Sequence, residues 1–230
     1  MNERYEIIFK PLQNGSDVRG SAIATEKEPR NLTPEIAADI AAGFLVWIEK
    51  KTGKPASKLK IGVGHDSRLT ADIIKRGVLS GLSGARAYDC GLASTPSLFI
   101  STILPESAFD GVVMITASHL PFNRNGMKFF TKDGGLEKAD ITEILMTAAE
   151  KDISVSETVN AESFDLVSAY SRRMMGIIKE EVGADDYDHP LKGLHIVVDA
   201  GNGASGFFAS RILEPLGADI SGSVFLDPDM

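Results

Sequence analysis

The sequence has a single cysteine, Cys90, among its 230 residues. An intramolecular disulfide is therefore excluded, which is typical of proteins that fold in a reducing compartment. No apolar run approaches the ~20 residues that a membrane-spanning helix needs, and the N-terminal segment MNERYEIIFKPLQNG lacks the apolar core of a secretory signal. These absences predict a cytoplasmic protein with no membrane partner.

The sequence also lacks a run of basic residues. It has 24 Lys and Arg against 32 Asp and Glu, and its formal net charge is -8. Surfaces that bind nucleic acid or anionic membranes need a basic patch, so neither is expected as a partner. Hydrophobic residues make up 43% of the chain, which is ordinary for a globular protein. Any anion site must therefore be local, built from a few basic side chains and backbone N–H groups.

Helix and strand patterns alternate from residue 5 to about residue 150. The sequence TPE at 33–35 predicts a helix start, apolar residues then recur at helical spacing, and Gly53 predicts the end. Strands are predicted over 5–10, within KIGVGHDSR at 60–68, where the strand runs into a loop, and over 111–115, and the last two are apolar on both faces. This alternation predicts an α/β domain whose mixed, mostly parallel sheet has helices on both faces.

A tight turn is predicted at Asn125-Gly126, since this dipeptide favours the turns that join antiparallel strands. The strand after it would then run antiparallel to its neighbour.

The chain becomes polar and loses its helical period between about Asp152 and Ala161. We therefore expect a first α/β domain over 1–155. Residues 156–230 are predicted to form a connecting helix and the incomplete start of a second α/β domain of similar type. A lone strand-loop-helix unit there cannot cover both faces of its strand, so this second domain looks unfinished.

Polar side chains gather where the strand at 111–115 ends. Ser118 and His119 follow it within the stretch TASHLPFNRNGMKFF, and Lys128 comes ten residues after Ser118. Ligands bind at the carboxyl ends of strands in open α/β sheets, where a serine hydroxyl can act as a nucleophile or a phosphate carrier. The residues alone leave this hypothesis about equal to a plain strand end and turn.

Two further motifs carry weaker predictions. Arg19, in NGSDVRG, offers a bidentate fork for phosphate, although an Asp-x-Arg pair frequently bonds internally. Asp66 and Arg68, in GHDSR, are best interpreted as an internal ion pair that shapes their loop.

The segment GNGASG at 201–206 fits the dinucleotide fingerprint G-x-G-x-x-G. Asp199 just before it would repel a pyrophosphate, and no acidic residue is convincingly placed for a ribose. A nucleotide-binding oxidoreductase fragment remains the alternative hypothesis. A non-catalytic α/β domain that binds a phosphate or a partner is the third.

Six motifs occur in one order along the chain: SDVRG, GHDSR, CGLASTPS, TASHLP, NGMKFF and VVDAGNGASGFFASRILEPLG. Together they resemble the N-terminal part of the α-D-phosphohexomutase superfamily, which includes phosphoglucomutases, phosphomannomutases and phosphoglucosamine mutases. The resemblance implies an enzyme that interconverts hexose 1-phosphate and hexose 6-phosphate through a phosphoserine and a bisphosphate intermediate. Glucose or mannose phosphate is the implied substrate, and the sequence does not separate them from glucosamine phosphate.

The resemblance also implies a role for each candidate residue. Ser118 would carry the phosphate and give one oxygen to Mg²⁺, the implied cofactor. Arg19 and Lys128 would bind the phosphate. His119 or Lys128 would move the proton of the sugar hydroxyl, and the sequence leaves open which. Leu120 stands where the family most commonly has asparagine.

The family's aspartate-rich magnesium loop, D-x-D-x-D-R, is not found in the sequence, nor are its sugar-recognition and second phosphate loops. We therefore expect an N-terminal fragment that is inactive alone. The oligomeric state stays open.

Overall fold

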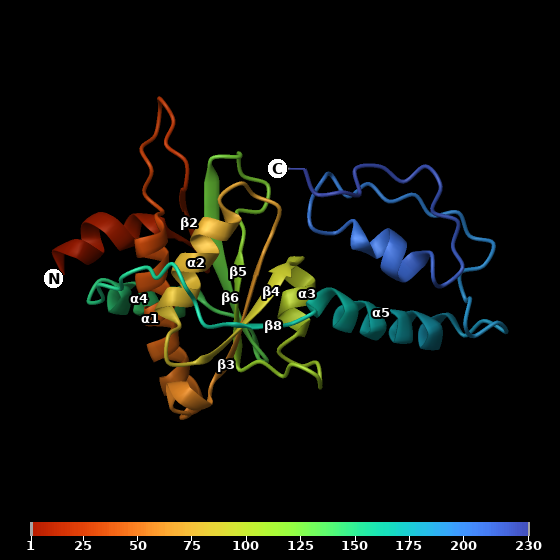
Figure 1. The fold of residues 1–230 in the computed structure, drawn as a ribbon, viewed down its shortest axis with the longest axis horizontal. Helices are drawn as coiled ribbons and strands as arrows, with labels where there is room; N and C mark the ends of the chain where they lie inside the picture. The colour runs from red at the N-terminus through yellow and green to blue at the C-terminus, as the bar shows by residue number, and fades with distance from the viewer. Residues whose placement is uncertain (1, 230) are drawn as a thin grey trace.

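One mixed sheet flanked by helices forms most of the computed structural model, which describes residues 2–229 (Figure 1). The helices are η1 Tyr5–Phe9, η2 Lys10–Leu12, α1 Pro34–Thr52, η3 Ala56–Lys58, α2 Ala71–Gly81, α3 Thr95–Ile100, α4 Lys138–Ala148, α5 Leu166–Val182 and η4 Ala209–Leu213. The strands are β1 Gln13–Asn14, β2 Asp17–Ser21, β3 Lys60–His65, β4 Arg86–Leu92, β5 Gly111–Ile115, β6 Arg124–Thr131, β7 Gly134–Gly135 and β8 Glu162–Ser163.

The strands follow the order β1-β2-β6-β5-β3-β4-β8, and β7 pairs with β6. The run β5-β3-β4-β8 is parallel, whereas β6 is antiparallel to both β5 and β2. The carboxyl ends of β3 and β5 therefore lie at one edge of the sheet, so the loops after His65 and Ile115 are neighbours.

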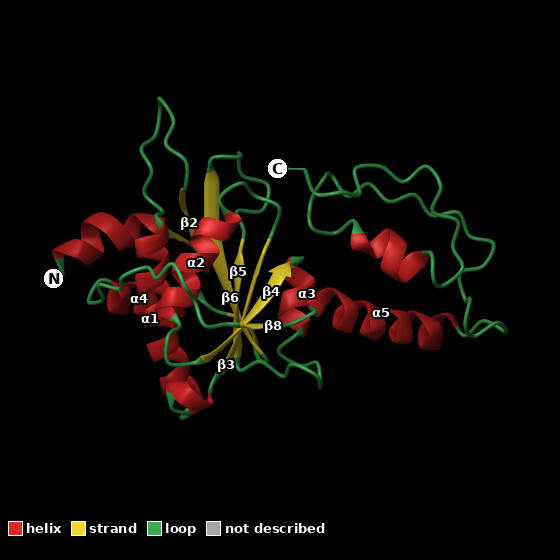
Figure 2. Cartoon of the chain, in the orientation of Figure 1, coloured by secondary structure: helices red, strands yellow, loops and turns green. Residues whose placement is uncertain are grey.

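Helices cover both faces of the sheet (Figure 2). Side chains from α1, α2 and α4 pack with Ile61, Val63 and Val113 in one buried cluster. Side chains from α3 and α5 pack with Val112 and Met114 in the other. Strand β5 is buried along its whole length, as a central strand covered on both faces must be. The predicted mixed sheet with helices on both faces is confirmed. Within residues 2–229, no helix has both the length and the apolar character to cross a membrane.

Two glycines allow α1 and α2 to pack closely. A Cβ atom added at Gly77 would lie 2.1 Å from the carbonyl oxygen of Pro34, and one at Gly81 would lie 2.0 Å from that of Ala38. No real side chain fits at such distances, so the two helices touch through their backbones.

We predict that Gly81→Ala lowers the free energy of unfolding by about 1–3 kcal/mol, because the helices must move apart. The matched control is Gly176→Ala in α5, where nothing lies within 4 Å of the added Cβ and helix propensity favours alanine by up to about 1 kcal/mol. Urea unfolding followed by fluorescence of Trp47, the single tryptophan, measures both. Equal stability of the two variants would contradict the close packing.

The predicted strand over 5–10 is wrong, because this segment is helical. Tyr5, Ile8, Phe9 and Leu12 all pack into the cluster that α1 and α4 share. Their spacing of three, four and seven residues is that of one helix face, whereas Ile7 is 66% exposed. Burial of this face against the helices decides the conformation.

The predicted turn at Asn125-Gly126 is also wrong, although the following strand is antiparallel as predicted. Both residues lie inside β6, opposite Gly20 and Arg19 of β2. A Cβ on Gly126 would be 2.1 Å from the Val18 carbonyl oxygen, so this glycine serves strand packing. The chain reverses earlier, in the loop that carries Ser118.

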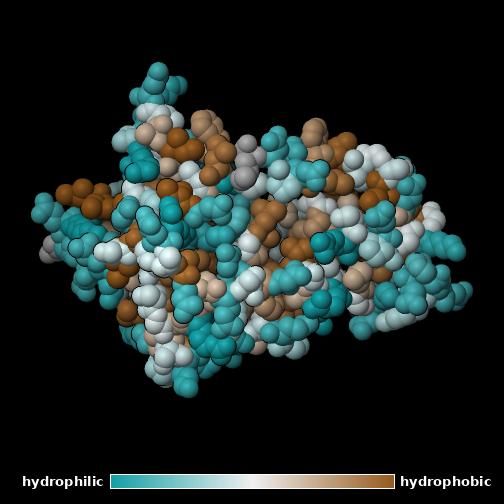
Figure 3. All heavy atoms as spheres, in the orientation of Figure 1, coloured by the Kyte–Doolittle hydropathy of each residue, from teal (hydrophilic) through white to brown (hydrophobic). Residues whose placement is uncertain are grey.

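The C-terminal unit follows α5 and has no regular strand among its described residues. The strand of the strand-loop-helix unit predicted in this part of the chain is not formed, and only the isolated bridges His195–Asp219 and Asp199–Val224 occur there. The Ser223 hydroxyl accepts the Val198 N–H between them, which interrupts the ladder. Apolar side chains remain exposed here, among them Val197 at 56% and Phe225 at 58%. Hydrophobic residues, in brown, are visible on the surface of this part of the molecule in Figure 3. The proposed boundary at residue 155 stays a prediction, and β8 extends the first sheet beyond it.

Candidate active site

The four predicted site residues line one hollow of about 400 Å³, together with Asp17. Strand β2 carries Arg19, the loop after β5 carries Ser118 and His119, and β6 carries Lys128. Arg19 comes close to Ser118 because β6 pairs with β2 on one side and with β5 on the other. A cavity of about 560 Å³ lies elsewhere and is lined in part by Lys51 and Lys132. Only the smaller hollow gathers a hydroxyl, an imidazole and two cations.

Ser118 is exposed and has an unusual backbone conformation. Its φ is 56°, in the left-handed region, which costs an ordinary residue roughly 1–2 kcal/mol. The Ser118 N–H donates to the Thr116 hydroxyl at 2.9 Å, and its own hydroxyl lies 3.3 Å from Nδ1 of His119. Such a held backbone is common at functional sites, where surrounding contacts maintain it.

Asp17 holds both cations of the hollow. Its Oδ2 accepts from Arg19 at 2.8 Å and from Lys128 at 2.6 Å. Arg19 also donates to the Thr116 carbonyl, and its side chain is only 6% exposed. Burial lowers the pKa of Arg19 while Asp17 acts in the opposite sense, and a guanidinium stays protonated in proteins. The internal Asp-x-Arg pair that the sequence allowed is present.

The hollow has a formal charge excess of one positive unit, from two cations and one carboxylate. A dianionic phosphate is a strong acceptor that gains most from charged donors. The arrangement therefore suits a phosphate more than a neutral ligand. Sequence reasoning did not include Asp17 among the site residues; its only sign was its place in SDVRG.

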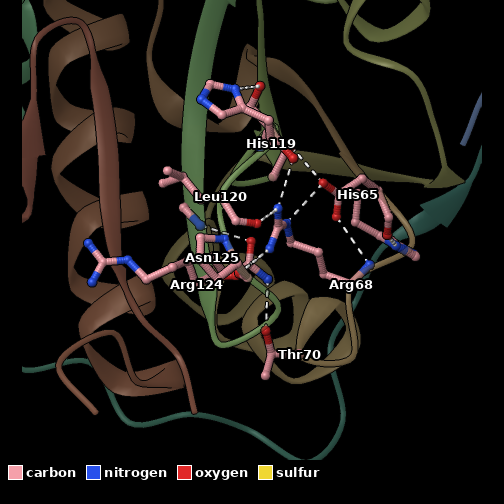
Figure 4. A network of polar contacts seen from close by, with 12 residues as sticks. His65, Arg68, Thr70, His119, Leu120, Arg124 and Asn125 are labelled. Atoms are coloured by element: carbon pink, nitrogen blue, oxygen red, sulfur yellow. Dashed lines mark hydrogen bonds and ion pairs between the residues drawn. The ribbon is translucent and has the colours of Figure 1, made fainter. Parts of the chain in front are cut away.

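Arg68 also belongs to the surroundings of the site. The predicted ion pair with Asp66 exists, with Nε 3.4 Å from Oδ2. The guanidinium reaches farther, to four backbone carbonyls, three in the loop that carries Ser118 and one at the start of β6 (Figure 4). The sequence motif did not predict these contacts, because every residue has a backbone carbonyl and the sequence does not show which of them will accept a hydrogen bond.

The residues around the hollow do not form a magnesium site by themselves. Among residues 2–229, no group of three His, Cys, Asp or Glu side chains could hold a metal ion. Asp17, the carboxylate that lines the hollow, already accepts from two cations.

Neither the single cysteine nor the GNGASG loop is suited to a reactive or cofactor site. Burial, and secondarily the charge of Asp89, raises the pKa of the Cys90 thiol to about 12, so this thiol is a poor nucleophile. The GNGASG loop lacks the regular strand before it that a dinucleotide site needs. A Cβ on Gly206 would lie 1.7 Å from the Leu226 carbonyl oxygen, so this glycine is needed for close backbone packing.

Comparisons with known proteins agree on one family. A family model described as phosphoglucomutase/phosphomannomutase, alpha/beta/alpha domain I, matches residues 10–155. A phosphoglucosamine mutase of Caldicellulosiruptor saccharolyticus is 31% identical over 83% of this chain and 41% of its own length. One of Ligilactobacillus salivarius is 30% identical over 94% of this chain and 46% of its own. The chain thus spans less than half the length of these curated relatives.

Solved structures share the fold. A phosphoglucomutase/phosphomannomutase family protein of Burkholderia thailandensis superposes with a TM-score of 0.73 and 23% identity, over all of this chain and 45% of the other. A putative phosphomannomutase of Thermus thermophilus gives a TM-score of 0.71 at 20% identity, over 95% of this chain and 47% of the other.

Proposed function

The chain belongs to the phosphoglucomutase/phosphomannomutase family, and we propose that it carries the phosphoserine site of a phosphohexomutase. The observation that supports this most is the meeting of Arg19 and Lys128 with Ser118 in one hollow. An exposed hydroxyl beside two cations is what a phosphate carrier needs, since the cations balance the charge that phosphorylation adds.

The proposed reaction transfers a phosphoryl group between Ser118 and a hexose. In one direction the Ser118 oxygen attacks the phosphorus of a hexose bisphosphate, an O–P bond forms, and the O–P bond to the sugar breaks. The serine proton leaves to a base, and the sugar oxygen takes up a proton. In the other direction a hydroxyl of a hexose phosphate attacks phosphorylated Ser118, giving the bisphosphate and the free serine. Arg19 and Lys128 stabilise the charge on the phosphoryl oxygens in both.

His119 and Lys128 are the candidates for moving protons in this proposal. The His119 ring nitrogen Nδ1 lies 3.3 Å from the Ser118 hydroxyl, within reach of its proton after small adjustment. Lys128 is paired with Asp17 and contributes positive charge. We therefore assign the serine proton to His119, while the donor and acceptor for the sugar hydroxyl stay open between the two residues.

The proposed substrate is a hexose phosphate, with glucosamine phosphate as the first to test because the relatives above are phosphoglucosamine mutases. Glucose phosphate and mannose phosphate are the substrates to test next. Since the chain spans 41% and 46% of those relatives, we propose that sequence equivalent to their remainder completes the site. That part would supply the other Mg²⁺ ligands and the contacts to the sugar and its second phosphate.

Incubating the 230-residue chain with glucosamine 1,6-bisphosphate or glucose 1,6-bisphosphate and Mg²⁺ tests the function. Intact mass and peptide mapping are expected to show one phosphate, on Ser118. A coupled assay on the same sample is expected to show no sustained conversion of hexose 1-phosphate to hexose 6-phosphate. If no bisphosphate labels Ser118, the proposal is wrong; sustained turnover would instead show that the 230 residues suffice.

A further inference from the structure

The segment from Asp66 to Thr70 holds the Ser118 loop along its whole length. We propose that Arg68 is a positioning residue, which fixes the backbone of this loop in the conformation that presents Ser118 for phosphoryl transfer. The proposal rests on the proposed function for the transfer itself. It assigns to Arg68 a role beyond the internal ion pair with Asp66.

The Arg68 guanidinium donates to the loop from both terminal nitrogens. Nη2 reaches one pair of carbonyl oxygens and Nη1 another, so all four hydrogens on these nitrogens have acceptors (Figure 4). The acceptors are the carbonyls of Ser118 at 2.8 Å, Leu120 at 2.7 Å, Pro121 at 2.8 Å and Arg124 at 3.0 Å. One side chain thus fixes the backbone on both sides of the chain reversal.

The neighbours of Arg68 anchor the two ends of the same loop. The Thr116 hydroxyl donates to Oδ2 of Asp66 at 2.6 Å and in turn accepts the Ser118 N–H. At the far end, the Asn125 side-chain amide donates to the Thr70 hydroxyl at 2.9 Å. The Arg68 contacts lie between these anchors. Three of them, to the carbonyls of Ser118, Leu120 and Pro121, hold the loop where no strand pairing restrains it. The fourth reaches Arg124, the first residue of β6, which is also paired with Ser21 of β2.

The contacts bear directly on the geometry of Ser118. Ser118 has a φ of 56°, in the left-handed region, which an unrestrained serine seldom adopts. The N–H of Ser118 is held by Thr116 and its carbonyl by Arg68, so both peptide groups of the residue are fixed. A misplacement of about 1 Å can slow such a reaction by about 10²-fold.

Arg68 is not placed to bind the phosphate itself. Its terminal nitrogens are occupied by carbonyls and its Nε faces Asp66, and it is not among the residues that line the hollow. Lysine could not take its place, because a single ammonium nitrogen has three hydrogens and cannot span four acceptors. The matched substitution is therefore Arg68→Lys, which keeps the positive charge and removes the two terminal nitrogens that bind the carbonyls.

The test measures two properties of Arg68→Lys in the 230-residue chain. The first is amide hydrogen exchange in 116–124, expected to rise about tenfold or more, while exchange in β3 and β5 stays unchanged. The second is phosphate transfer from glucose 1,6-bisphosphate to Ser118. We expect the maximum rate to fall about 10²-fold and the bisphosphate concentration for half-maximal rate to change less than about twofold, since phosphate contacts remain. The control is Arg124→Lys, at the first residue of β6 directly after the loop, where the guanidinium instead pairs with Glu28.

The outcomes separate this proposal from the proposed function. A maximum rate within about twofold of wild type, or equal losses in Arg124→Lys, would overturn the role of Arg68. Unchanged exchange in 116–124 would overturn it as well. If wild type takes up no phosphate, the proposed function fails, and exchange alone decides whether Arg68 fixes the loop. Should Arg68→Lys expose β3 and β5 to exchange, Arg68→Gln is measured in the same way.

Discussion

Ser118→Ala is expected to lose phosphate incorporation altogether, a drop of at least about 10³-fold against wild type, because the covalent carrier oxygen is removed. The fold and its stability should change little. The Ser118 side chain is exposed, and among the described residues its hydroxyl has a hydrogen-bond partner only in His119. Intact mass after incubation with a bisphosphate measures the loss, and thermal unfolding checks that the fold remains.

Two further variants separate the hydroxyl from the backbone at this position. Ser118→Gly also lacks the oxygen but tolerates the left-handed φ, so it should be as inactive as alanine and at least as stable. Ser67→Ala removes a hydroxyl from the neighbouring loop and should keep full incorporation. Phosphate on either Ser118 variant, at the wild-type rate, would place the carrier at another residue.

Local patterns predicted much of the fold because the stabilising contacts are themselves local. Thr33 caps α1 by accepting the Ile36 N–H, and Gly53 ends it in the left-handed conformation. Both features follow from residue type at a helix end. Strand β5 was likewise recognisable, since burial on both faces leaves an unbroken apolar run.

The errors arose where distant packing decided between two local options. The segment at 5–10 alternates well enough for a strand, yet Phe9 and Leu12 are buried against α1 and α4 as a helix face. Asn125-Gly126 has the composition of a turn, but Gly126 is required by its close approach to β2. Neither partner segment can be inferred from the few residues around the motif.

The candidate site likewise combines residues that the local sequence identifies with residues that only the fold brings together. Ser118, His119 and Lys128 lie within one short stretch, and their types alone left a nucleophile or phosphate carrier about equal to a plain strand end and turn. Bringing Arg19 to them needed the pairing of β2 with β6, and only the family resemblance suggested it. Asp17 and Arg68 were missed as supporting residues, because their roles depend on partners that folding brings together.

Lys128→Met is expected to lower the maximum rate of phosphate transfer to Ser118 by about 10²–10³-fold, the usual cost of removing one charged donor from a transferring group. The change is local. Asp17, which is partly buried, keeps its contact with Arg19, so its carboxylate is not left without a partner and the fold should be retained. The transfer rate is measured by quenched-reaction mass spectrometry.

Lys132→Met is the control that isolates position from charge. Lys132 is the first residue after β6, and it lines the separate cavity of about 560 Å³. Both substitutions move the formal net charge from -8 to -9, so long-range attraction of the anionic donor falls about equally in the two. Only Lys128→Met removes a cation from the hollow with Ser118. Equal small losses would mean that net charge accounts for the effect, and that Arg19 alone neutralises the phosphate. A large loss confined to Lys128, partly restored by Lys128→Arg, would assign that role to the ammonium position itself.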